Sequence, residues 1–485
     1  MYSARDVLWR GAGGRLRALS VALALAAPGC SGEAVEPRCA WLQSTLVADN
    51  LILMRRDSDL VAGKFVKMAS GLFPYMRGTA KQYLRDATES AVVPSETAFG
   101  SAGAARVLLV GDPHPENVGA FLTSDGEMTL EFNDFDGAVY GPFHLDLRRL
   151  AIGFYALGVA ANLEPETLAA MVHEVSRGYA DEIAAPDGEA IQIRAGAGFG
   201  EVIDDLLQKA RIAGDTEEPL MDYTRIEDDR REMFFGDVGT PEDAFVTDRV
   251  VPLRGDEVDL VSALVRRLDE RRGGEATRVK GMSRRLGAGV TSYPLLRYYV
   301  LVDGSADGVA DDYLLELREV QDPFLVNQLP RYATLPFASN GERVVFAQQA
   351  IHEASDHDPH LGWAGLGALS VRVRWHTGYQ RALDAARIVD KIAEETWDGQ
   401  DVAELAYWAG RLLARGHAQA LTETGSPAGA VIREAVDGDW DGLIAETDAY
   451  ALAYGGQLRL DYELFLQMLE SDGPLLGGRA REGAP

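Results

Sequence analysis

The spacing of apolar residues divides the chain into helical ends and a mixed middle part. Apolar positions recur every three or four residues in 40–56 and 60–69, which predicts amphipathic helices there. The stretch 70–80, "SGLFPYMRGTA", contains glycine and proline and predicts a break after these helices. From about residue 377 the helical spacing returns and continues to about residue 470.

Short β-type runs occupy the middle part between longer helical patterns. "RVLLV" at 106–110 and "MTLEF" at 128–132 predict two strands, and residues 146–183 predict two helices. Residues 284–320 read as a glycine-containing loop followed by a β-hairpin. A helix over 341–356 and a strand over 369–375 complete the pattern, so we expect an α+β fold.

Composition narrows the partners of the chain. The 485 residues carry a formal net charge of -28, and clustered basic residues are what nucleic-acid contacts need, so we expect no nucleic-acid partner. Anionic membrane surfaces are disfavoured for the same reason. The chain has only six lysines, so an enzyme that requires a catalytic lysine has few candidates: Lys64, Lys67, Lys81, Lys209, Lys280 and Lys391.

The N-terminal residues predict export. Basic residues precede "ALSVALALAA", an apolar run of signal-peptide length, so we assign 1–29 to a signal peptide and 30–59 to a linker and helix. "AAPGC" is similar to a lipobox, which predicts lipidation of Cys30 and a membrane-anchored or periplasmic protein. If cleavage is of the plain type, Cys30 and Cys39 can instead pair in an oxidising compartment. If the leader is no signal peptide, the protein is cytoplasmic.

Two polar clusters follow the strand-like runs. "GDPHPEN" places Asp112, His114 and Asn117 just after the first run, and "NDFD" places Asp134 and Asp136 after the second. A carboxylate at a strand end can act as a general base or a metal ligand. In an extended segment Asp134 and Asp136 point the same way and can share a cation. Hard oxygen ligands favour magnesium or calcium over zinc. An ordinary solvated turn is the alternative for each cluster alone.

The two clusters resemble the catalytic and metal-binding loops of aminoglycoside and choline kinase relatives. This resemblance implies that Asp112 acts on the acceptor hydroxyl, with His114 beside it, and that Asn117 and Asp134 bind magnesium with Asp136 assisting. Gly141 and Asp146 follow Asp134 at plus seven and plus twelve, as in the aminoglycoside group.

The chain also resembles, over roughly residues 60–470, the bacterial family catalogued as domain of unknown function 2252, which is thought to be kinase-like. The matching segments are "MASGLFPYMRG", "GDPHPENVG", "NDFDGAVYGPFHLDLRRL", "LREV", "GERVVFAQQ" and "LARGHA". The family commonly has lysine where this chain has Arg318, and arginine is not an equivalent phosphate ligand.

The resemblance implies a protein-kinase-like, two-lobed fold with a large helical lobe. Residues 60–275 and 376–485 would form that lobe, and 276–375 a small lobe. Because the segment like a nucleotide-binding lobe follows the catalytic loop, we interpret the order as a circular permutation. Gly287, Gly289 and Arg318 would then contact ATP or another nucleotide.

The expected function is magnesium-dependent phosphoryl transfer to a small molecule that the sequence does not specify. One alternative is an inactive kinase-like binding lipoprotein, which the absence of the family's lysine favours. A second is a metal-dependent phosphoester hydrolase that uses the same carboxylates.

Overall fold

The computed structural model describes residues 37–478, apart from 90–91, 102, 186–189, 217, 238–248, 275, 305–307, 326–336 and 354–357. The chain forms a mixed α+β structure whose sheets are antiparallel. The signal-peptide and lipidation predictions for residues 1–29 and Cys30 lie outside the described residues. Cys39 is buried near the start of the first helix.

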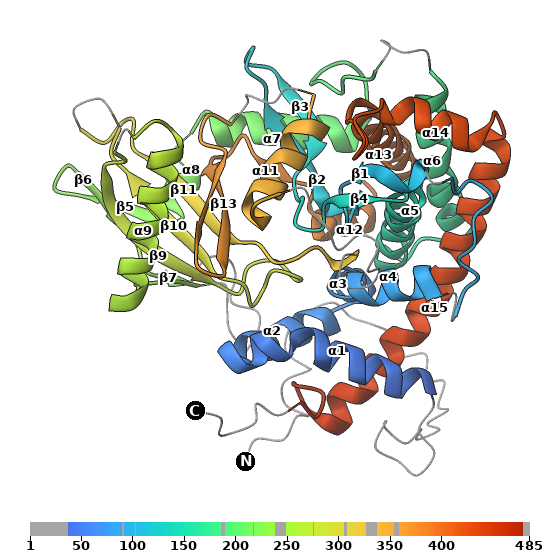
Figure 1. Cartoon of the computed structure of the whole chain (residues 1–485), viewed down its shortest axis with the longest axis horizontal. Helices are drawn as coiled ribbons and strands as arrows, with labels where there is room; N and C mark the ends of the chain where they lie inside the picture. The colour runs from blue at the N-terminus through green and yellow to red at the C-terminus, as the bar shows by residue number, and fades with distance from the viewer. Residues whose placement is uncertain are drawn as a thin grey trace.

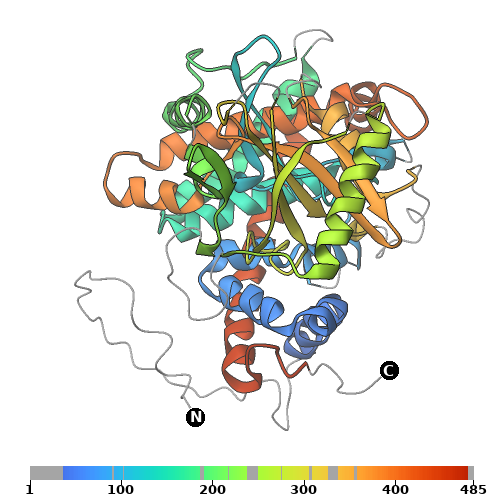
Figure 2. The ribbon, with the colours of Figure 1, turned by 90° about the vertical axis from the view of Figure 1, so that its left-hand side faces the viewer.

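A seven-stranded sheet forms one side of the molecule, with strand order β12-β13-β11-β10-β9-β8-β7 (Figure 1). The predicted hairpin is confirmed, because β10 pairs with β11 in register from Arg297–Arg318 to Val302–Tyr313. Helix α9 covers the sheet, as the end-on view shows (Figure 2), and its apolar side packs on a buried cluster of strand residues. The strands and adjoining helices of this part are β7 (Gly236–Asp237), β8 (Arg249–Val251), α9 (Gly255–Arg271), β9 (Val279–Leu286), β10 (Arg297–Val302), β11 (Tyr313–Glu319), α11 (Asn340–Ile351), β12 (Gly362–Leu366) and β13 (Leu369–His376).

Long helices form the other side and enclose the largest buried apolar cluster. Helices α6 and α13 approach closely, because a Cβ on Gly178 would lie 2.1 Å from the Tyr407 carbonyl oxygen and one on Gly410 would lie 2.2 Å from that of Val175. Glycine at these two positions therefore permits backbone contact that a larger residue would prevent. The helices are α5 (Phe143–Ala160), α6 (Pro165–Ala184), α7 (Glu201–Gly214), α8 (Glu218–Met221), α12 (Ala385–Ala393), α13 (Gly399–Gln419), α14 (Ala428–Val436) and α15 (Trp440–Asp472).

Small sheets lie between the two sides and carry the polar loops. The two predicted strands are confirmed as β1 and β3, but they belong to different sheets, one of order β1-β4 and one of order β14-β2-β3. These elements, with the short helices beside them and the separate β5–β6 hairpin, are η2 (Ala104–Arg106), β1 (Val107–Leu109), η3 (Pro115–Asn117), β2 (Val118–Leu122), β3 (Met128–Phe132), β4 (Val139–Gly141), β5 (Thr224–Glu227), β6 (Arg230–Met233) and β14 (Arg381–Ala382).

Four N-terminal helices run beneath both sides (Figure 1): α1 (Pro37–Arg56), α2 (Ser58–Ala69), α3 (Leu72–Gly78) and α4 (Ala80–Glu89). The predicted break over 70–80 is wrong in part. The chain turns at Gly71 and Thr79, but the residues between them form α3, whose apolar side chains are buried. Burial on the core outweighs the low helix propensity of Pro74, which lies in the first turn, where proline is tolerated.

The N-terminal helices also contact the loop between β9 and β10. Arg56 donates to the Pro294 carbonyl at 2.7 Å and pairs with Glu319 at 2.8 Å. A Cβ on Gly63 of α2 would lie 2.7 Å from Tyr293 Cε1, so helix and loop are in direct contact. Among the helices that the structure describes, none has the length and apolar character that a membrane span requires.

Candidate functional site

Asp112 lies just beyond the end of β1 in a loop that a neighbouring carboxylate holds. Asp146, in the first turn of α5, accepts hydrogen bonds from the backbone N–H groups of Val110 at 2.7 Å and Gly111 at 3.2 Å. Arg149, one turn later, donates from Nε to Asp112 Oδ1 at 2.8 Å. A second Arg149 nitrogen binds the Met76 carbonyl at 2.8 Å, so the guanidinium is fixed between α3 and the loop. The position and orientation of Asp112 are therefore set by α5.

Burial and charge act in opposite directions on this carboxylate. Burial raises the pKa of Asp112 above its usual value, and the nearby charge of Arg149 partly offsets that rise. Burial, together with the positive charges of Arg77 and Arg149, lowers the pKa of His114 well below its usual value. His114 is therefore neutral near pH 7, and its ring lies edge-on to Phe73 with a centroid separation of 6.0 Å. A carboxylate of raised basicity suits a general base better than the histidine does.

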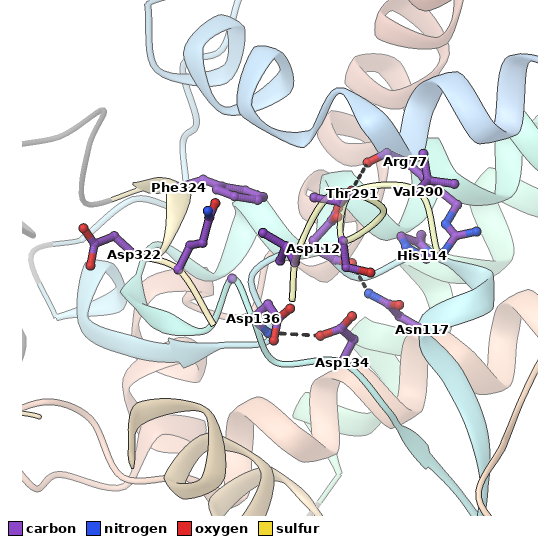
Figure 3. A pocket seen from close by; sticks show the side chains of 14 residues that line it. Arg77, Asp112, His114, Asn117, Asp134, Asp136, Val290, Thr291, Asp322 and Phe324 are labelled. Atoms are coloured by element: carbon purple, nitrogen blue, oxygen red, sulfur yellow. Dashed lines mark hydrogen bonds between the residues drawn. The ribbon is translucent and has the colours of Figure 1, made fainter. Parts of the chain in front are cut away.

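Asn117, Asp134 and Asp136 lie close to Asp112, as the sequence predicts (Figure 3). The Asn117 amide nitrogen donates to the Asp112 carbonyl at 2.7 Å, which fixes the side chain. The backbone N–H of Asp136 donates to Asp134 Oδ1 at 3.2 Å, which closes a tight turn. The two metal-ligand candidates of this turn therefore lie side by side.

Arg318 of β11 binds both of these carboxylates. Its guanidinium donates to Asp134 Oδ1 at 2.7 Å, to Asp134 Oδ2 at 3.2 Å and to Asp136 Oδ1 at 2.7 Å. Burial disfavours ionisation of Asp134, yet the charges of Arg318 and Arg372 hold its pKa below the usual range. Burial raises the pKa of Asp136, and the charge of Arg318 opposes this rise. The turn and β11, far apart in sequence, are thus joined by an ion pair.

The loop between β9 and β10 covers the same space. Gly287 and Gly289 have φ of 77° and 82°, which glycine adopts without the strain that other residues incur. They do not line the cavity themselves; the residues that follow do, with Val290, Thr291 and Ser292 facing it. The Thr291 hydroxyl donates to the Arg77 carbonyl at 2.8 Å, which connects the loop to α3.

Together these segments line a cavity of about 650 Å³, part of which is open to solvent. Figure 3 shows the side chains of Asp112, Asp134 and Asp136 around it, with Phe324 on one side and Arg77 on the other. Arg77 forms a salt bridge with Glu116. The Arg77 side chain also lines the cavity. Five of the predicted site residues line the cavity: Asp112, His114, Asn117, Asp134 and Asp136.

The two acidic loops touch through their backbones. A Cβ on Gly111, whose φ is 96°, would lie 2.1 Å from the carbonyl carbon and oxygen of Gly137. Only glycine permits both the conformation and this approach. The loop that carries Asp112 and the turn that carries Asp134 and Asp136 therefore pack directly on each other.

Two buried arginines that the sequence analysis did not single out organise this region. Arg149 orients Asp112, and Arg343 of α11 donates to the Ala138 carbonyl at 2.6 Å and the Gln321 carbonyl at 2.9 Å. Both are almost completely buried, at 1% and 0% exposed. The available signal is an arginine within an apolar helix, in "DLRRLAIGF" and "GERVVFAQQ", because a buried charge requires partners.

A family of bacterial proteins matches residues 56–468, which is most of the chain, and the matched region includes every element of the cavity. The chain belongs to the DUF2252 family. The family is described only as an uncharacterized protein conserved in bacteria. No curated protein and no solved structure matches the chain. Membership of DUF2252 therefore assigns no activity to this chain.

Proposed function

We propose that this protein is a kinase-like phosphotransferase that acts on a small molecule with magnesium and a nucleotide. The supporting observation is that Asp112, Asn117, Asp134 and Asp136 converge on one cavity beneath the loop between β9 and β10. Phosphoryl transfer depends mainly on positioning and on neutralising charge, so a base, oxygen ligands for a cation and a covering loop provide the required groups.

Asp112 is the proposed base for the acceptor hydroxyl. Arg149 fixes its orientation through Oδ1, and its other carboxylate oxygen is available to the cavity that Asp112 lines. Its raised pKa makes the carboxylate a stronger proton acceptor than an exposed aspartate. His114, kept neutral by burial, forms part of the wall behind the acceptor.

The donor atoms of the site suit magnesium. Magnesium in phosphoryl-transfer sites is held by one or two carboxylates together with waters and substrate phosphates. Asp134 and Asp136 provide the carboxylates, and Asn117 provides an amide oxygen. Within the described ranges, no group of three or more acidic, histidine or cysteine residues could hold a metal. In the proposed site, waters and substrate phosphates would supply the remaining ligands. When bound, magnesium would neutralise the charge of the transferring phosphoryl group.

The order of the elements supports the kinase-like, permuted interpretation. Strand β9 leads through a glycine-containing loop into strands β10 and β11. Strand β11 carries the cation Arg318, and helix α11 follows it. Arg318 would contact the nucleotide phosphates from β11, after exchanging part of its pairing with Asp134 for them. Gly287 and Gly289 would allow the loop to approach those phosphates.

An inactive binding protein is the second candidate, and one observation favours it. Arg318 makes three hydrogen bonds to the carboxylates that would hold magnesium. A cationic side chain in this position supplies positive charge without a metal, so the pocket could retain a ligand and lack catalysis.

Nucleotide binding tests the proposal. The melting temperature of the purified protein is measured against ATP concentration, with and without magnesium, and again in Asp134→Ala. A ligand that binds only the folded state at a hundredfold excess over its dissociation constant stabilises it by about 2.7 kcal/mol. We expect a magnesium-dependent rise that Asp134→Ala abolishes. No rise at millimolar ATP in the folded protein contradicts the proposal, and phosphate release from an ester without nucleotide would indicate a hydrolase.

A further inference from the structure

A second cavity of about 380 Å³, part of which is open to solvent, adjoins the first. It is lined from α1 by Asp49 and Asn50, from α2 by Lys64 and from α4 by Lys81 and Gln82. The two cavities are contiguous, because both are lined by three common residues: Thr291, Gln321 and Phe324. The second cavity therefore extends the candidate active site toward the N-terminal helices.

Two ammonium groups enter this cavity. Lys64 is 5% exposed and donates to Asn50 Oδ1 at 3.0 Å, and Lys81 Nζ lies 5.1 Å from the Phe324 ring centroid. In the part of the chain that the structure describes, neither ammonium has a carboxylate within salt-bridge distance. Burying a charge without an opposite charge is costly. Two of the six lysines in a chain of net charge -28 meet here, so the arrangement calls for an anion.

The acidic residue of the cavity is already neutralised. Asp49 accepts hydrogen bonds from two Arg85 nitrogens at 2.6 and 2.7 Å, and from the Gln82 amide at 2.9 Å. The Asp49–Arg85 pair has no net charge, although the charge of Asp49 still favours the protonated form of both lysines, so Lys64 and Lys81 leave the cavity positive. Burial, followed by the charge of Lys81, lowers the pKa of Lys64 to about 7, and burial also lowers the pKa of Lys81.

We propose that this second cavity binds the oxyanionic group, phosphate or carboxylate, of the small molecule that is acted on beside Asp112. The inference that the same molecule reaches Asp112 rests on the proposed function; the inference that Lys64 and Lys81 bind an anion does not. Compact ammonium groups bind oxyanions as point charges. Thr291 and Phe324 line both cavities. With its anionic group held in the second cavity, a small molecule would extend past these two residues toward Asp112.

Isothermal titration calorimetry at constant ionic strength tests the site with two probes. Sulfate represents a phosphate group and has no proton to exchange near pH 7, and acetate represents a carboxylate. We expect saturable binding of at least one probe, and its identity distinguishes the two anion types. Lys81→Gln should weaken that binding by about ten- to a hundredfold, as expected for the loss of a hydrogen bond to a charged group. Lys67→Gln, three residues from Lys64 on α2 but packed against Tyr293, is the matched control and should bind normally.

Proton uptake gives a second measurement. An anion beside Lys64 favours its charged form, so binding at pH 7 should take up a fraction of a proton, up to about one half. Titrations in buffers of different ionisation enthalpy measure this uptake, which Lys64→Gln should abolish. The other charges that face Lys64 are Lys81 and the Asp49–Arg85 pair.

The outcomes separate this inference from the proposed function. Saturable anion binding that depends on Lys81, in a protein that binds no nucleotide, supports the anion site and contradicts the phosphotransferase. Nucleotide binding without anion binding supports the phosphotransferase and contradicts the anion site. Absence of binding by both probes, or binding that Lys81→Gln leaves unchanged, overturns the inference.

Discussion

Arg318→Met should destabilise the protein by an amount that depends on pH and on magnesium. The arginine is 6% exposed and makes three hydrogen bonds to Asp134 and Asp136, whose side chains are 28% and 23% exposed. Removing one partner of a buried ion pair costs about 3–5 kcal/mol. Because water still reaches about a quarter of each carboxylate, we expect a loss near the lower end, about 3 kcal/mol at pH 7.

The pH dependence of this loss follows from the aspartates. In the wild type, the pKa of Asp134 is depressed, so its contribution to stability is present above its ordinary pKa of about 3.9 and is lost as pH falls through the lower folded value. Without Arg318 the two carboxylates repel each other, so the pKa of Asp134 rises above the ordinary range and that of Asp136, which is already raised, rises further. The variant should therefore recover stability relative to wild type as pH falls from 7 to 5.

Magnesium should also restore stability to the variant if the carboxylates can hold it. A hundredfold excess over the dissociation constant contributes about 2.7 kcal/mol, which is nearly the whole loss. Urea unfolding followed by circular dichroism, at pH 7 with chelator, at pH 7 with magnesium and at pH 5, measures the three values. Arg267→Met, which removes an exposed pair with Glu270, is the control and should change stability by less than about 1 kcal/mol. An Arg318→Met protein as stable as wild type at pH 7 with chelator would refute the reasoning.

Two further predictions concern the acidic loops. Gly111→Ala should cost more than about 4 kcal/mol of unfolding free energy, because its φ of 96° is combined with a 2.1 Å approach to Gly137. The control Gly126→Ala has a φ of 83° and open space around the added Cβ, so it should cost only about 1–2 kcal/mol. Equal losses of stability in urea unfolding would exclude the close contact as the cause. The rate of phosphoryl transfer should fall as pH decreases through a pKa of Asp112 above the ordinary 3.9, since only the ionised form is a base. In a pH profile of the rate, Arg149→Met should move this decrease to higher pH, because the charge that opposes the raised pKa of Asp112 is lost. A shift to lower pH would contradict the assignment of Asp112 as the base.

The sequence predicts the local chemistry of the site better than its long-range connections. Asp112 follows β1, Asn117 directly precedes β2, and Asp134 and Asp136 follow β3. Strand ends place side chains at an edge, so their convergence could be anticipated. The pairing of Arg318 with Asp134 joins residues 184 positions apart. Such a contact depends on how the seven-stranded sheet packs beside the turn, which local patterns do not encode.

The N-terminal helices illustrate the same limit. Proline and glycine predict a break over 70–80, but packing on the core makes the segment between Gly71 and Thr79 helical. Lys64 lies on the helix that the apolar spacing predicts, and its burial near Lys81 arises only when α2 and α4 both pack against α1. A charged residue at an apolar helix position can be recognised in the sequence. The residues that surround it in the fold cannot.

The contact between Gly111 and Gly137 has a mechanical consequence. Since the two acidic loops meet backbone to backbone, a displacement of one displaces the other, and the carboxylates on both form the fixed floor of the cavity. The floor meets the seven-stranded sheet through the side chain of Arg318 on β11, and the loop between β9 and β10 meets α3 through the Thr291 hydroxyl. Side-chain contacts of this kind can exchange partners. Ligand entry can therefore change these side-chain contacts while the two acidic loops keep their relative position.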